Sequence, residues 1–181
     1  MQQDWQLIWR FLGIAFYVLF YFACIFIINI GQSSFSIISV PAVLVPILLI
    51  WITGLMRRKG KLTLTNSISL LLFTIPPIIC LYLLGQNEYK STFTTDKWLQ
   101  YETERTYMID DLLANHPLKG KQEQEIIALL GSNIEMNYFK EDDNIVYHLG
   151  MERGLVSIDS EWLVIHLDDN RVADKVEVVT D

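Results

Sequence analysis

Three long runs of apolar residues fill most of the first 85 positions of the chain, and polar residues are spread through the rest. The runs cover residues 11–30, 37–55 and 64–84 and contain no Asp, Glu, Lys, Arg or His. An α-helix rises about 1.5 Å per residue, so roughly 20 apolar residues cross a hydrocarbon core about 30 Å thick. Three such runs in a soluble protein would leave too little polar sequence to cover them. The pattern therefore predicts three transmembrane helices, with residues 1–85 as the anchor of a multi-pass membrane protein.

The first run lacks the marks of a processed leader. A cleaved signal peptide has a shorter apolar stretch, a basic start and a small-residue cleavage site, whereas this chain begins with one acid and one base, Asp4 and Arg10. Residues 21–24 are only faintly similar to a lipoprotein cleavage box, because Tyr21 and Phe22 are bulky and the apolar run continues past Cys24. We expect the first run to remain as a helix.

The acidic half of the chain begins after Gly85 and changes pattern twice. Residues 86–96 are polar and unpatterned, which predicts a linker before a domain at 97–181. Thr95 or Asp96 can cap a helix that Pro117 and Gly120 end, and its apolar residues fall roughly on one face: Trp98, Tyr101, Met108, Leu112 and Leu113. A shorter helix is expected at 121–130, with Gly131 as its C-terminal cap. The period then becomes two, which predicts strands at 134–139, 145–150, 162–167 and 172–179. Alternation puts two sets of residues on one face of the second and third of these strands: Ile145, Tyr147 and Leu149, and Leu163, Ile165 and Leu167. The expected fold is α+β, with two helices followed by an antiparallel sheet of three or four strands.

Positive charge within the anchor is concentrated in one short loop that contains Arg57, Arg58, Lys59 and Lys61. Short loops rich in Lys and Arg stay on the cytoplasmic side of a membrane. This loop is therefore expected to be cytoplasmic and to determine the topology. Three spans then put the N-terminus in the cytoplasm and the acidic domain outside the cell (plasma or inner) membrane.

The two halves of the chain have opposite charge. Five basic residues and one acidic residue lie before position 86, a net charge of +4, so the remaining 96 residues carry −11 of the chain's total of −7. A segment of that length can bury one small core. Its negative charge argues against a nucleic-acid partner, which requires a basic surface.

Part of the acidic half resembles a known family. The order of a helix ending in KGKQEQEIIALLGS, a strand with YHLG and a strand with LVIHLDDNRV is similar to the small protein A / outer-membrane lipoprotein A family, the BamE-like domains. The likeness covers about residues 115–179. The matching positions are Gly120, Ile126, Leu130, Gly131, Tyr147, Leu149, Leu163, Asp168, Arg171 and Val172.

The resemblance implies a small envelope domain that binds proteins and has no catalytic activity. The sequence departs from the family in two ways. Ser132-Asn133 stands where the family has proline after LG, and three apolar runs stand in place of a single lipidated cysteine. The different anchor argues against the family's role in outer-membrane assembly.

Several polar groupings were candidates for a ligand site. His148 and His166 lie on predicted neighbouring strands, but alternation puts each opposite the core face and no cysteine accompanies them, so no metal site is expected. Residues 141–144 and 168–170 resemble fragments of calcium loops, yet neither has the glycine and distal glutamate of an EF-hand. Their position between strands favours turns, with weak calcium binding as the open alternative.

A catalytic role is not expected, because Ser157, Asp159 and Ser160 form no known nucleophile motif. The long connection at 151–161 is the expected partner-binding segment, since function on small scaffolds concentrates in long loops. Its candidate residues are Met151, Glu152, Arg153, Leu155, Ser157 and Asp159.

The expected function is display of a small protein-binding domain at the cell envelope, with no cofactor and with the lipid bilayer and another envelope or membrane protein as partners. The alternative is an accessory subunit of a membrane complex, in transport or sensing, that acts mainly through its transmembrane helices.

Overall fold

The computed structural model describes residues 2–56, 64–132, 138–154 and 157–181. The chain divides into two compact units, Met1–Glu88 and Tyr89–Asp181. Each unit is described separately below. The basic loop at 57–61 lies outside the described residues.

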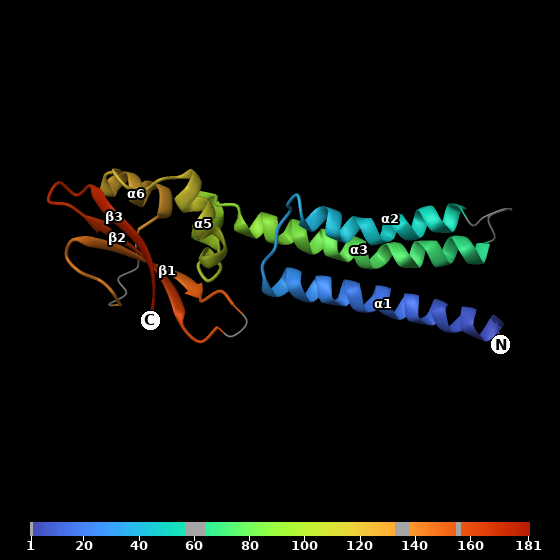
Figure 1. Cartoon of the computed structure of the whole chain (residues 1–181). Helices are drawn as coiled ribbons and strands as arrows, with labels where there is room; N and C mark the ends of the chain where they lie inside the picture. Colours follow the sequence, from blue (N-terminus) through green and yellow to red (C-terminus); the bar gives the residue numbers. More distant parts are fainter. Residues whose placement is uncertain (1, 57–63, 133–137, 155–156) are drawn as a thin grey trace. The chain divides into compact units, whose positions relative to one another are not determined.

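The first unit is helical (Figure 1). Its elements are α1 (Gln2–Ile30), α2 (Ser39–Met56) and most of α3 (Leu64–Ser91). By length and composition, the described stretches Asp4–Ile30 and Leu70–Ser91 could each cross a membrane, and Ser39–Thr53 is a shorter apolar helix. Helices are thus confirmed over all three apolar runs, whereas three membrane crossings stay a prediction.

Polar side chains join the helices of the first unit. The Tyr21 hydroxyl donates to the carbonyl oxygen of Val43 at 2.7 Å, and the Asn87 amide donates to the carbonyl oxygens of Ile28 at 3.0 Å and Ser33 at 2.9 Å. In an apolar surrounding, a polar group without a partner is costly, so these bonds hold specific helix pairs together.

The linker expected at 86–96 is largely helical. α3 continues to Ser91, and α4 (Thr95–Gln100) begins four residues later, with the Thr94 hydroxyl accepting a hydrogen bond from the Lys97 amide as its N-terminal cap. The cap therefore lies one residue before Thr95 and two before Asp96, the two predicted caps. Asn87 belongs to the helix because its side chain has partners in the first unit, which the local polar composition does not reveal.

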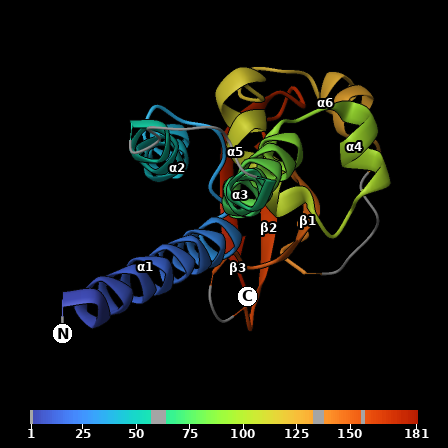
Figure 2. The same cartoon turned by 90° about the vertical axis from the view of Figure 1, so that its right-hand side faces the viewer.

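In its described residues, the second unit has α4, α5 (Arg105–Asn115) and α6 (Glu123–Leu130), followed by three strands. The strands β1 (Asn144–Met151), β2 (Ser160–Leu167) and β3 (Ala173–Thr180) form one antiparallel sheet in the order β1-β2-β3. Figure 2 views the same elements from a second direction. The α+β prediction is confirmed.

The single helix predicted before Pro117 is wrong, because it is broken into α4 and α5. The break forms where Glu104 pairs with Gly150 of β1 as an isolated bridge. A Cβ at position 150 would lie 2.3 Å from the Thr103 carbonyl oxygen, so only glycine permits this approach. The two residues are far apart in the sequence, so no local sequence pattern predicts the break.

The strand predicted at 134–139 falls mostly outside the described residues. Tyr138 and Phe139, which are described, are not in a strand. Among the described residues the sheet has three strands, which is within the three or four that the sequence predicts.

The alternation along the strands places the core correctly. The predicted inward residues of β1 and β2 are buried in one cluster with residues of α4, α5 and α6: Ile145, Tyr147, Leu149, Leu163, Ile165 and Leu167. Gly131 ends α6 with a φ of 81°, as predicted for a C-terminal cap. The opposite face of the sheet carries a smaller cluster of Val146, Trp162 and Val164, and the Tyr138 ring stacks on Trp162 with centroids 5.7 Å apart.

Candidate functional site

The predicted partner-binding segment is the connection between β1 and β2. Its base is closed by a hydrogen bond from the Glu152 amide to the Asp159 carbonyl oxygen at 2.8 Å, and the Ser157 hydroxyl donates to the Glu152 carbonyl oxygen. Leu155 lies outside the described residues. Met151 is 54% exposed and Ile158, which the sequence analysis did not single out, is 77% exposed. The segment therefore presents apolar side chains to solvent from a closed base.

Arg153 ties this segment to α5 and β2. Its Nη1 lies 2.6 Å from Asp110 Oδ2 of α5, and its Nε lies 3.4 Å from Glu161 Oε1 of β2. Burial by itself would lower the pKa of Arg153, but the hydrogen bonds and charges of Asp110 and Glu161 outweigh burial and raise it. Arg153 thus restrains the loop and is less available to a partner than its exposed neighbours.

The two strand histidines are not brought together. In the register of β1 and β2, His148 pairs with Trp162 and His166 pairs with Asn144. The His148 ring packs against the Trp162 ring at 4.7 Å, and His166 Nε2 lies 2.8 Å from Glu177 Oε1. Among the described residues, no group of three His, Cys, Asp or Glu side chains is placed to hold a metal ion.

The two acidic segments are turns. In the first, the side-chain nitrogen of Asn144 donates to the Phe139 carbonyl oxygen, and the side-chain oxygen of Asn144 accepts from the backbone amide of Glu141. In the second, Asp168 Oδ1 accepts from the backbone amides of Asn170 and Val172. These are the local hydrogen bonds by which Asn and Asp shape turns. Weak calcium binding stays untested.

The turn between β2 and β3 is clamped to the start of α6 by Arg171. Its guanidinium makes a two-pronged contact with the Glu123 carboxylate, at 2.8 Å through Nε and 2.5 Å through Nη2. Arg171 has a φ of 59°, an unusual backbone conformation for a residue other than glycine. The Asp168 turn and the Glu123 contact together hold it there.

This clamp predicts a pH effect. The hydrogen bond from Arg171 lowers the pKa of Glu123 below its ordinary value of 4.5. The folded state therefore binds this proton less readily than the unfolded state, so the stabilisation is present above pH 4.5 and is lost as the pH falls through the lower folded value. We expect Glu123→Gln to flatten the acid side of a Tm–pH profile. The control is Asp169→Asn, which removes a carboxylate from the turn that contains Arg171 and leaves the contact between Glu123 and Arg171 in place. Identical profiles for both variants would contradict the assignment.

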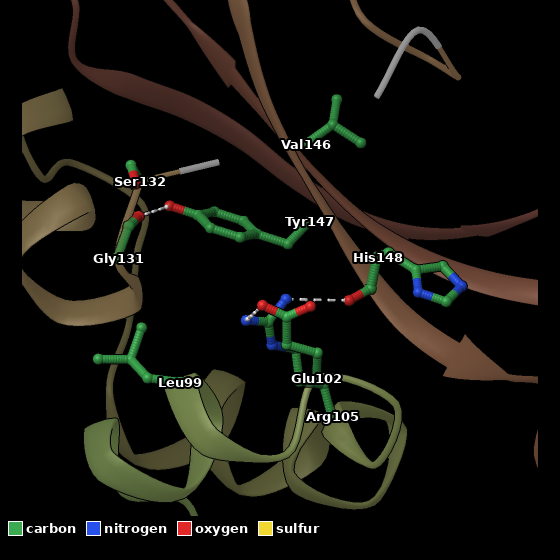
Figure 3. A pocket seen from close by; sticks show the side chains of 8 residues that line it. All are labelled: Leu99, Glu102, Arg105, Gly131, Ser132, Val146, Tyr147 and His148. Carbon is green, nitrogen blue, oxygen red and sulfur yellow. Dashed lines mark hydrogen bonds and ion pairs between the residues drawn. The ribbon is translucent and has the colours of Figure 1, made fainter. Parts of the chain in front are cut away.

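A pocket of about 290 Å³ lies between α4, α5 and β1 (Figure 3). Its lining combines one buried cation with a carboxylate and with other polar and apolar residues: Leu99, Glu102, Arg105, Gly131, Ser132, Val146, Tyr147 and His148. The Tyr147 hydroxyl donates to the Gly131 carbonyl oxygen at 2.7 Å, which joins β1 to the end of α6, and burial raises its pKa.

Arg105 is the centre of this pocket and had no signal in the sequence pattern. It is only 7% exposed. Its Nε donates to the Trp98 carbonyl oxygen at 2.9 Å and its Nη1 donates to the His148 carbonyl oxygen at 3.3 Å, while the guanidinium lies over the Trp98 ring at 4.9 Å. Burial lowers its pKa, opposed by the charge of Glu102, whose carboxylate is 3.8 Å away. Arg105 thus joins α4, α5 and β1.

The described arrangement offers binding surfaces more than reactive groups. Neither Ser157 nor Ser160 makes a hydrogen bond to a histidine in the described part of the chain, so neither has the neighbour that activates a nucleophile. The absence of enzymatic activity nevertheless stays a prediction.

The chain matches no protein-family model, no curated protein and no solved structure.

Proposed function

We propose that this protein is a multi-pass membrane protein of the bacterial cell envelope that displays a small, non-catalytic protein-binding domain. The observation that carries the proposal is the division of the chain into two compact units of different chemistry. One consists of apolar helices. The other has its own hydrophobic core and, with nine basic and 19 acidic residues, a net charge of −10.

The exposed side chains of the first unit support membrane insertion. Large apolar side chains are exposed along the described parts of α1, α2 and α3, among them Phe16, Leu48 and Leu71. A water-soluble protein rarely exposes contiguous apolar surface of this kind. In a bilayer the same side chains contact lipid, so all three helices are proposed to span the membrane, with the 57–61 loop in the cytoplasm.

Contacts at the motif positions support a BamE-like second unit. Gly120, with a φ of 85°, donates its amide to the Ala173 carbonyl oxygen at 2.7 Å, and Val172 forms a bridge with Gln122. Together with the contact between Arg171 and Glu123, these hydrogen bonds hold the start of α6 against the turn between β2 and β3. Three of the motif residues, Gly120, Arg171 and Val172, therefore meet where α6 begins. The protein-binding role implied by the resemblance is part of the proposal.

Thiol labelling in intact cells tests the orientation. Asp169→Cys places a thiol in an exposed turn of the second unit, and we expect a membrane-impermeant maleimide to label it without lysis. Gln6 lies near the start of α1, at the end of the first span that is proposed to be cytoplasmic. Gln6→Cys is therefore expected to react only after permeabilisation. The unsubstituted chain gives the background from Cys24, which is half-buried, and Cys80, which is buried. The reverse pattern of labelling would refute the proposed orientation and move the search for partners to the cytoplasm.

A further inference from the structure

The outer edge of β3 has free backbone hydrogen-bonding groups. The Asp181 amide donates to the Ser160 carbonyl oxygen at 3.3 Å, so Asp181 faces β2. Backbone groups alternate between the two sides of a strand, and those of Val176, Val178 and Thr180 therefore point away from β2. In the described part of the chain these outward groups have no hydrogen-bond partner.

At the opposite edge of the sheet, several outward backbone groups of β1 have hydrogen-bond partners. On β1, the outward carbonyl oxygens of Asn144 and His148 accept hydrogen bonds from Lys140 and Arg105, and Gly150 pairs with Glu104. The start of β3 is also closed, because Ala173 exchanges backbone hydrogen bonds with the Gly120–Lys121 segment. Proteins usually cover or interrupt a free edge, since it is a template for another strand. Among the described residues, the stretch of β3 from Val176 to Thr180 therefore has less cover than β1, where side chains of Lys140 and Arg105 occupy part of the edge.

Side chains along β3 indicate what a neighbouring strand must carry. On the helix-covered face, Val176 packs partly against the core and Val178 is 37% exposed. On the other face, Lys175 lies 2.8 Å from Glu177, so its charge is largely compensated. Asp174 and Asp181 flank the open stretch, within a unit of net charge −10. A strand with apolar residues on one face and basic residues on the other is complementary to this edge.

We propose that β3 binds an extended segment of a partner protein, with alternating apolar and basic residues, as a fourth strand of the sheet. The main chain of the segment pairs with Val176, Val178 and Thr180, while its apolar side chains cover Val178 and its basic side chains face the acidic residues. This rests on the proposed protein-binding function and specifies both the surface and the chemistry of the partner.

A peptide titration tests the edge directly. The full chain in lipid nanodiscs is titrated with a short peptide of alternating valine and lysine, and with one of alternating valine and glutamate. We expect the lysine peptide to bind more tightly and to slow hydrogen exchange at the amides of Val176, Val178 and Thr180. Val178→Pro removes an outward donor that the sheet itself does not use. It is expected to weaken binding about tenfold, whereas Val178→Ala changes it less than about threefold.

A charge variant keeps the test decisive if the proline variant does not fold. Glu177→Lys is expected to reverse the order of the two peptides. Absence of binding, equal binding of both peptides, or protection that excludes β3 would overturn the proposal. Concentration-dependent pairing of two copies through β3 without peptide binding would do the same, because the occupant would then be a second chain. None of these results affects the labelling of Asp169→Cys, so failure of the edge and failure of the envelope orientation are distinguishable.

Discussion

Replacing Arg105 with alanine is expected to lower the free energy of unfolding of the second unit by about 3 kcal/mol. The substitution leaves the buried carbonyl oxygen of Trp98 and the carbonyl oxygen of His148 without their donors. It also removes a cation from the face of the Trp98 ring, a contact that contributes about 2 kcal/mol in a desolvated site. Loss of the Arg105 side chain would also enlarge the pocket that it lines.

The measurement is urea unfolding of the full chain in lipid nanodiscs, followed by hydrogen exchange at the amides of β1 and β2. Lys90→Ala is the matched control, because Lys90 also pairs with a carboxylate, Glu104 at 3.4 Å, but both side chains are about 40% exposed. An exposed ion pair is worth about 0.2–1 kcal/mol. Equal losses in the two variants would show that Arg105 does not join α4, α5 and β1 in the way inferred from its contacts.

Gly150→Ala is expected to destabilise the second unit by about 4 kcal/mol, through two effects that act together. Gly150 has a φ of 120°, which strains any residue with a Cβ. The new Cβ would also lie 2.3 Å from the Thr103 carbonyl oxygen, a backbone atom that cannot move without disrupting the bridge between Glu104 and Gly150. Backbone strain and overpacking each cost about 1–3 kcal/mol.

Gly120→Ala separates these two effects. Gly120 also has a positive φ, 85°, but an added Cβ would meet nothing within 4 Å. We therefore expect it to show the strain alone, about 1–2 kcal/mol, when unfolding is measured in the same way. A loss at Gly150 no larger than that at Gly120 would mean that α4 and α5 are not held apart by this close approach.

The elements that depend on near neighbours were predictable. Apolar runs of about one membrane thickness predicted helices, and the period of two predicted β1, β2 and β3. It also predicted the inward residues of β1 and β2, because alternating Ile145, Tyr147 and Leu149 leaves only one face to bury. Gly131 marked the end of α6 for a similarly local reason, since a glycine readily adopts the positive φ found there.

Elements set by distant contacts were not predictable. Trp98, Met108 and Leu112 suggested one continuous helical face, whereas the approach of Thr103 to Gly150 interrupts the helix between them. Arg105 resembles any charged helix residue in sequence, and its partners at Trp98 and His148 appear only when α5 packs on β1. The loop at 151–161 was found from its length, but the restraint of Arg153 by Asp110 and Glu161 depends on packing.

The sequence by itself determined the division into an apolar basic half and an acidic half, the helices of the apolar runs, α6, the three strands, and which residues of β1 and β2 turn inward. Each of these follows from periodicity and composition, which a chain carries in any conformation. Only the tertiary structure decided where the helix breaks, which buried cation joins α4, α5 and β1, and which sheet edge stays open. Those features depend on residues far apart in sequence, whose interactions exist only after the backbone has brought them within hydrogen-bonding distance.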